Sequence, residues 1–78
     1  MTLPTVLDAG DGLTIERDAA LGVARHVVAA TALIIGQEPL LTQTGSDIAL
    51  NNLADILGGP HWIDHADALL DAIEEEGR

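Results

Sequence analysis

The fold depends on one apolar stretch, residues 21–35, which reads Leu-Gly-Val-Ala-Arg-His-Val-Val-Ala-Ala-Thr-Ala-Leu-Ile-Ile. Leu21, Val28 and Ile35 recur every seven residues, a spacing that is typical of one face of an α-helix. The second half of the stretch has no polar face. Because a helix that is apolar all round is buried on more than one side, the sequence predicts a central helix over residues 16–35.

Two other structures compete for the same stretch, a membrane span and a buried β-strand. A membrane span needs about 20 apolar residues, and here Arg25 and His26 interrupt the start of the run. Val, Ile and Thr favour strands, but the length of the run and its alanines at 29, 30 and 32 favour a helix. We therefore expect a helix that does not cross a membrane.

Two further segments have the spacing of amphipathic helices, residues 46–57 and 60–76. Gly45-Ser46-Asp47 is expected to cap the first of them, and Pro60 fits the first turn of the second. The apolar face of the first consists of Ala49, Leu50, Leu53, Ala54, Ile56 and Leu57. That of the second consists of Trp62 or Ile63, with Ala66, Leu69, Leu70 and Ile73. Before them, Leu40 and Leu41 are expected to point inward.

The N-terminal segment, residues 1–15, has two interpretations. The β-prone runs 5–7 and 13–15 flank a cluster of Asp and Gly, which is typical of a β-hairpin. In the alternative the segment is an irregular arm, and Thr14 caps the central helix. In both, Asp8 and Asp11 serve turn chemistry. The chain is thus predicted to be one all-α domain, a small three-helix antiparallel bundle with an N-terminal hairpin or arm.

The size of the chain predicts a homo-oligomer. A domain of 78 residues is marginally stable alone, and this one has no cysteine that could add a disulfide. Its hydrophobic content is 47%, yet Trp62 is its only aromatic residue. We expect part of the apolar surface to meet another chain. The residues predicted to lie in the core or the oligomer contact are Val27, Val28, Leu33, Ile34, Ile35 and Trp62.

The charge of the chain restricts its partners. Thirteen acidic residues and three arginines give a formal net charge of −10. Such a surface repels nucleic acid and anionic membranes and suits a basic protein partner. The N-terminus lacks the basic and apolar regions of a signal peptide, so a cytoplasmic protein is expected.

An acidic helix face is the predicted contact for that partner. Asp64, Asp67, Asp71 and Glu74 follow one another at helical spacing, and none has a cation four residues later. No Ser/His/acid triad, phosphate-binding loop or carboxylate pair predicts catalysis, and no cofactor is expected. The sequence favours a non-catalytic interaction or regulatory protein, for example a phage or accessory protein that blocks a basic host surface.

A metal-binding module is the first alternative. His61, Asp64 and His65 are spaced i, i+3 and i+4, so two imidazoles and a carboxylate share one helix face. This arrangement is half of a zinc or nickel site. It differs from the zincin motif because Trp62 stands where that motif has its Glu.

Two short resemblances supply the remaining alternatives. Gly45-Ser46-Asp47-Ile48 resembles the attachment site of acyl carrier proteins, which implies a prosthetic group on Ser46, although here the Asp follows the Ser. Residues 53–58, Leu-Ala-Asp-Ile-Leu-Gly, are similar to the first half of a repressor helix-turn-helix. The helix that would read DNA, residues 61–70, contains three Asp and no Lys or Arg. The segment therefore predicts, as an alternative, a degenerate helix-turn-helix regulator.

Overall fold

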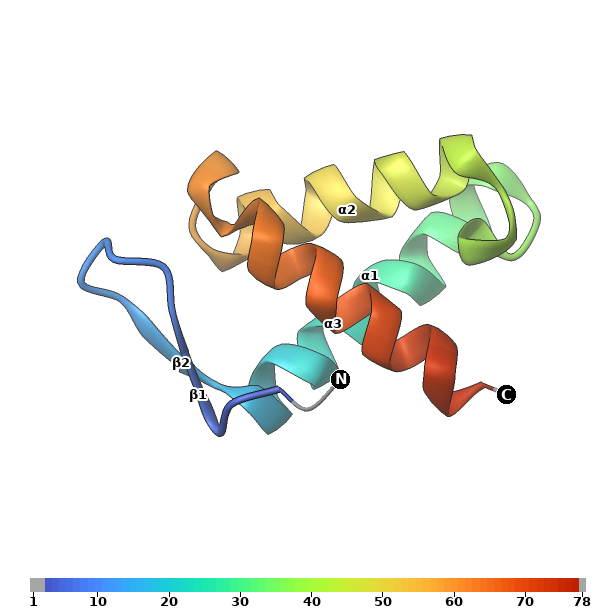
Figure 1. Cartoon of the computed structure of the whole chain (residues 1–78). Helices are drawn as coiled ribbons and strands as arrows, with labels where there is room; N and C mark the ends of the chain where they lie inside the picture. Colours follow the sequence, from blue (N-terminus) through green and yellow to red (C-terminus); the bar gives the residue numbers. More distant parts are fainter. Residues whose placement is uncertain (1–2, 78) are drawn as a thin grey trace.

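The computed structural model describes residues 3–77, and these form three α-helices and a two-stranded hairpin (Figure 1). The helices are α1 (Arg17–Ile35), α2 (Gln43–Leu57) and α3 (Ile63–Glu76), and the strands are β1 (Val6–Asp8) and β2 (Thr14–Glu16). Short 3₁₀ turns, η1 (Pro39–Leu41) and η2 (Pro60–Trp62), precede α2 and α3. The mostly helical fold and the hairpin are as predicted. Residues 1–2 of the expected arm and residue 78 lie outside the described residues.

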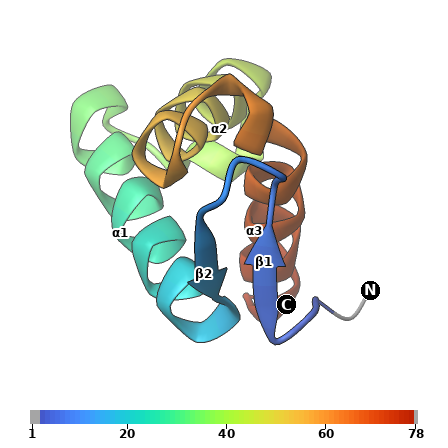
Figure 2. The ribbon, with the colours of Figure 1, turned by 90° about the vertical axis from the view of Figure 1, so that its left-hand side faces the viewer.

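The helices cross one another. In Figure 1, α2 extends across the top of the molecule, while α3 runs obliquely over α1 instead of lying alongside it. Seen from the left-hand side, α1 and α3 flank the hairpin beneath α2 (Figure 2). Ala20 and Ala24 form much of the buried face of α1, and such small side chains let neighbouring helices approach closely. The predicted antiparallel arrangement of the three helices is thus not confirmed.

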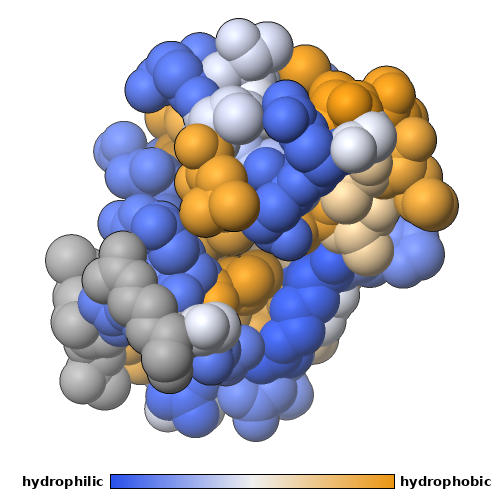
Figure 3. Space-filling view, turned by 90° about the vertical axis from the view of Figure 1, so that its right-hand side faces the viewer, coloured by the Kyte–Doolittle hydropathy of each residue, from blue (hydrophilic) through white to orange (hydrophobic). Residues whose placement is uncertain are grey.

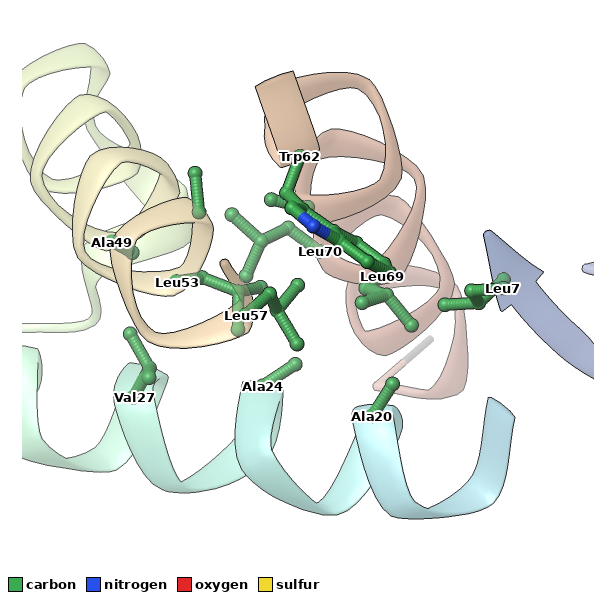
Figure 4. Packing of buried hydrophobic residues seen from close by; sticks show 12 residues of the cluster. Leu7, Ala20, Ala24, Val27, Ala49, Leu53, Leu57, Trp62, Leu69 and Leu70 are labelled. Atoms are coloured by element: carbon green, nitrogen blue, oxygen red, sulfur yellow. The ribbon is translucent and has the colours of Figure 1, made fainter. Parts of the chain in front are cut away.

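The core lies where the three helices meet. Trp62, Leu53 and Leu69 are fully buried, and Leu7 from the hairpin is buried with them. Figure 4 shows these side chains, which come from η2, α2, α3 and β1, together with Ala20, Ala24 and Val27 of α1. No buried side-chain nitrogen or oxygen within residues 3–77 lacks a hydrogen-bond partner. The prediction that Trp62 belongs to the core is consistent with this packing.

The hairpin interpretation of the N-terminal segment is confirmed. Leu7 pairs with Ile15 in the antiparallel register, and the burial of Leu7 fixes the hairpin on the helices. The turn contains Gly10 and Gly12 at φ values of 84° and 87°, which favour glycine. Thr14 is a strand residue and does not cap α1, which begins after Glu16 without a side-chain cap.

The start of α2 differs from the prediction. The helix begins three residues earlier, and Thr42 is its cap, since Thr42 Oγ1 accepts a hydrogen bond from the Gly45 backbone N–H at 3.0 Å. Gly45 is buried inside the helix, where an added Cβ would collide with the Pro39 backbone. Gly45 therefore serves close packing, and the predicted cap at Ser46 is wrong.

The prediction that α1 is buried on more than one side is also wrong. Its buried residues are Ala20, Ala24, Val27 and Thr31, a single stripe. Leu33 and Ile34 are 88% and 76% exposed. The physical reason is that α2 and α3 pack against the same stripe, and residues 3–77 contain no further helix to cover the other side. By length and composition alone, α1 is also apolar enough to cross a membrane.

Two further predictions of buried side chains are also wrong, because no element within residues 3–77 covers these positions. Leu41 was expected to point inward and is 81% exposed, whereas Pro39 beside it is fully buried. Ile56 was expected on the buried face of α2 and is 62% exposed. Both side chains lie on apolar surface that a chain of this size leaves uncovered.

Candidate functional site

One carboxylate, Asp11, connects the hairpin turn to the start of α3. Its Oδ2 accepts a hydrogen bond from Trp62 Nε1–H at 2.8 Å and lies 2.7 Å from His61 Nε2. Its Oδ1 accepts from the Leu13 backbone N–H at 3.0 Å. Since an ionised carboxylate only accepts, His61 carries its proton on Nε2. Asp11, His61 and Trp62 are called the Asp11 cluster below.

These donors change the acidity of Asp11. The hydrogen bonds from Trp62, His61 and the Leu13 backbone hold the pKa of the Asp11 carboxyl well below its ordinary value of 3.8. Hydrogen bonds to a carboxylate favour its charged form. The predicted turn chemistry of Asp11 is therefore present, together with a long-range contact that the sequence did not predict.

His65 connects α3 itself to the hairpin, whereas His61 and Trp62 belong to η2. His65 Nε2 lies 3.0 Å from the backbone oxygen of Asp8, and the His65 ring lies 5.3 Å from that of Trp62. The Nε2 atoms of His61 and His65 thus approach two different hairpin oxygens. Within residues 3–77, no group of three or more His, Asp and Glu side chains is arranged to hold a metal ion. Asp64, the third predicted ligand, lies exposed on the first turn of α3.

An acidic groove lies between α2 and α3. Its volume is about 210 Å³. The acidic side chains that line it are Asp47, Asp67, Asp71 and Glu74. Its remaining lining residues are Leu40, Gln43, Ser46, Leu50 and Leu70. Three of the four residues predicted as the interaction face therefore line one groove, and Asp64 is outside that set.

The arginines of the described chain are engaged elsewhere. Arg25 Nη2 donates to both carboxylate oxygens of Glu76, at 2.8 and 3.0 Å. Arg17 Nη1 donates to the Leu3 carbonyl oxygen at 3.3 Å. Neither Arg17 nor Arg25 is among the residues that line the acidic groove.

The groove contains two residues that the sequence did not associate with the acidic face. Asp47 belongs to α2, and Gln43 Nε2 donates to its Oδ1 at 3.0 Å. Ser46, the predicted attachment residue, is half-buried one turn inside α2, and its hydroxyl donates to the Pro39 carbonyl oxygen at 3.4 Å. Only the packing of α2 on α3 brings these side chains together, so no local pattern identifies them.

The residues predicted for the core or the oligomer contact fall into three classes. Val27 and Trp62 are buried, Val28 and Ile35 are half-buried, and Leu33 and Ile34 are exposed. Figure 3 shows apolar surface on the right-hand side of the molecule, over the end of α1 and the connection to α2. The end of α1 thus combines core residues with an apolar surface.

Hollows flank the end of α1 on both sides. One hollow, of about 250 Å³, lies between α1 and α2, and its lining includes Ala30, Ile34 and Ile56. The other, of about 460 Å³, lies toward η1 and α3, and its lining includes Leu41 and Glu38. Both hollows have mainly apolar walls. Asp55 is the carboxylate in the lining of the first, and Glu38 and Glu74 are the carboxylates in the lining of the second.

Comparisons of this chain with protein-family models, with curated proteins and with solved structures find no match.

Proposed function

We propose that this chain is a small non-catalytic interaction protein that docks a basic segment of a protein partner in the acidic groove. The observation that carries the proposal is the convergence of carboxylates from α2 and α3 on one groove. A concave surface lined by one sign of charge concentrates its electric field and attracts oppositely charged ligands. Lys and Arg side chains of a partner are the complementary groups.

The apolar part of the groove adds a shape requirement. Leu50 and Leu70 lie among the carboxylates, so a bound segment gains from apolar side chains between its cations. Long Lys and Arg side chains satisfy both needs, because their methylene stems pack on apolar surface while their charged ends reach carboxylates. The preferred ligand is therefore an amphipathic basic peptide.

The proposal is tested with a short dye-labelled peptide rich in Arg and Leu. Fluorescence anisotropy at low salt measures its affinity for the full chain and for the Asp67→Asn/Asp71→Asn variant. We expect the variant to bind at least about tenfold more weakly, which corresponds to about 1.4 kcal/mol. Wild-type affinity is expected to fall as salt is raised.

A matched control distinguishes binding in the acidic groove from attraction to the net charge of the whole protein. Glu16→Gln/Glu38→Gln removes the same two charges from exposed positions outside the groove. It is expected to weaken binding only slightly. Equal losses in the two double variants would mean that the peptide responds to the overall charge of the protein, and the docking proposal would be rejected.

A further inference from the structure

The end of α1 presents apolar side chains that residues 3–77 leave uncovered. Leu33 and Ile34 are 88% and 76% exposed, and Ile56 of α2 is 62% exposed. Ala30 and both isoleucines line the hollow between α1 and α2. Scattered apolar residues are ordinary on a protein surface, but a set gathered around a hollow marks an interaction site. Ala30, Leu33, Ile34 and Ile56 are called the α1–α2 apolar face.

We propose that this face binds a second copy of the same chain in a two-fold homodimer. A two-fold interface uses the same patch on both partners, so a projection and a recess on one patch can fit each other. Leu33 is the most exposed large apolar residue within residues 3–77, and the hollow lies between α1 and α2. The face therefore supplies both elements of a self-complementary contact.

Charge favours a second copy at this face over other surfaces of the molecule. Two copies that each carry −10 repel wherever their acidic surfaces meet. Residues 27–37 contain no ionisable side chain. The lining of the hollow contains one carboxylate, Asp55, and one imidazole, His26. The lining of the hollow beside Leu41 contains two carboxylates, Glu38 and Glu74.

A reversible dimer of so small a chain needs a contact of moderate size. A standard interface covers about 800 Å² per partner, which is roughly a sixth of the 4693 Å² surface of this chain. A few central side chains carry most of the binding energy in such contacts, and here three large aliphatic residues are available. We expect a dissociation constant in the micromolar range. The face shares no residue with the acidic groove, so the inference is independent of the proposed function.

The test is sedimentation velocity on the full chain from low micromolar to near-millimolar concentration, supported by native mass spectrometry. Wild-type protein is expected to form a dimer. Leu33→Asp and Ile34→Asp place a charge in the contact and are expected to raise the dissociation constant at least about tenfold. Leu41→Asp is the matched control, because it adds the same charge at an 81% exposed leucine outside the face, and it should dimerise like wild type.

Circular dichroism is expected to be unchanged in all three variants, because each replaced side chain lies mostly in solvent. A wild-type chain that stays monomeric throughout the concentration range would overturn the proposal. So would a dimer that Leu41→Asp dissociates and Ile34→Asp leaves intact. A monomer that binds vesicles of zwitterionic phosphatidylcholine, which carry no net charge, through Leu33 and Ile34 would assign the face to a lipid surface instead. Peptide binding in the acidic groove is unaffected by any of these outcomes.

Discussion

Asp11 accepts three hydrogen bonds and thereby joins two distant parts of the chain. Trp62 is fully buried, so its indole N–H needs an acceptor that water does not supply. Asp11 Oδ2 is that acceptor, and it approaches His61 Nε2 at the same time. One side chain of the hairpin turn thus completes the hydrogen bonding of the largest residue in the core.

The lowered pKa of Asp11 predicts how this contact depends on pH. A carboxyl whose pKa is lower in the folded state stabilises the fold above its unfolded pKa, near 3.8, and loses this effect as the pH falls further. Asp11→Asn is therefore expected to lower the thermal midpoint at neutral pH, with the difference from wild type shrinking below about pH 4. Thermal unfolding followed by circular dichroism over this range measures it. Asp18→Asn is the control, because the Asp18 side chain is 85% exposed and lies outside the hairpin turn. A pH-independent Asp11→Asn effect would contradict the assignment.

At the scale of elements, two helical glycines have opposite roles. Gly22 lies on the exposed side of α1, where an added Cβ meets no atom within 4 Å. Gly45 lies in α2, where an added Cβ would lie 2.7 Å from Pro39 Cα. The same substitution should therefore stabilise one helix and destabilise the other.

We expect Gly22→Ala to raise the free energy of unfolding by about 0.5–1 kcal/mol, because alanine restricts the unfolded chain and favours helix. Gly45→Ala is expected to lower it by about 1–3 kcal/mol through overpacking against backbone. Urea unfolding curves of the two variants measure both changes. Equal signs for the two substitutions would contradict the packing described for α2.

The sequence predicts which segments are helical better than it predicts where the helices begin. Periodicity located all three helices, because the stripes that contain Val27, Leu53 and Leu69 are long and regular. The predicted start of α2 was wrong, because a glycine is expected to mark a helix boundary. Gly45 instead packs closely against Pro39, and no local sequence pattern predicts that contact. Burial of Leu33, Ile34 and Ile56 was overestimated, since periodicity identifies apolar faces without indicating whether another element covers them.

At the scale of the whole molecule, the net charge of −10 opposes the compact state. Exposed carboxylates on α3 and around the acidic groove repel one another, and salt screens exposed charges over about 10 Å at 0.1 M. The three carboxylates of the groove that lie on α3 were predicted as one face from their spacing. Asp47 was not predicted, because it joins them only through the packing of α2 on α3.

Salt is therefore expected to stabilise this protein. Raising potassium chloride from a few millimolar to about 1 M should increase stability by roughly 1 kcal/mol, which corresponds to about 4–8 °C in thermal midpoint for a domain of this size. Differential scanning calorimetry measures the shift, and Asp67→Asn/Asp71→Asn should respond less steeply. A midpoint that falls with salt would mean that ion pairs such as Arg25–Glu76 outweigh the repulsion.

The link between the hairpin and α3 also bears on how the protein is made. Asp11 meets His61 across a separation of 50 residues, and Asp8 meets His65 across 57. During translation, Asp8 and Asp11 are therefore synthesised at least 50 residues before the histidines that they contact. The nascent hairpin segment stays without these contacts in η2 and α3 until residues 61–65 have left the ribosome.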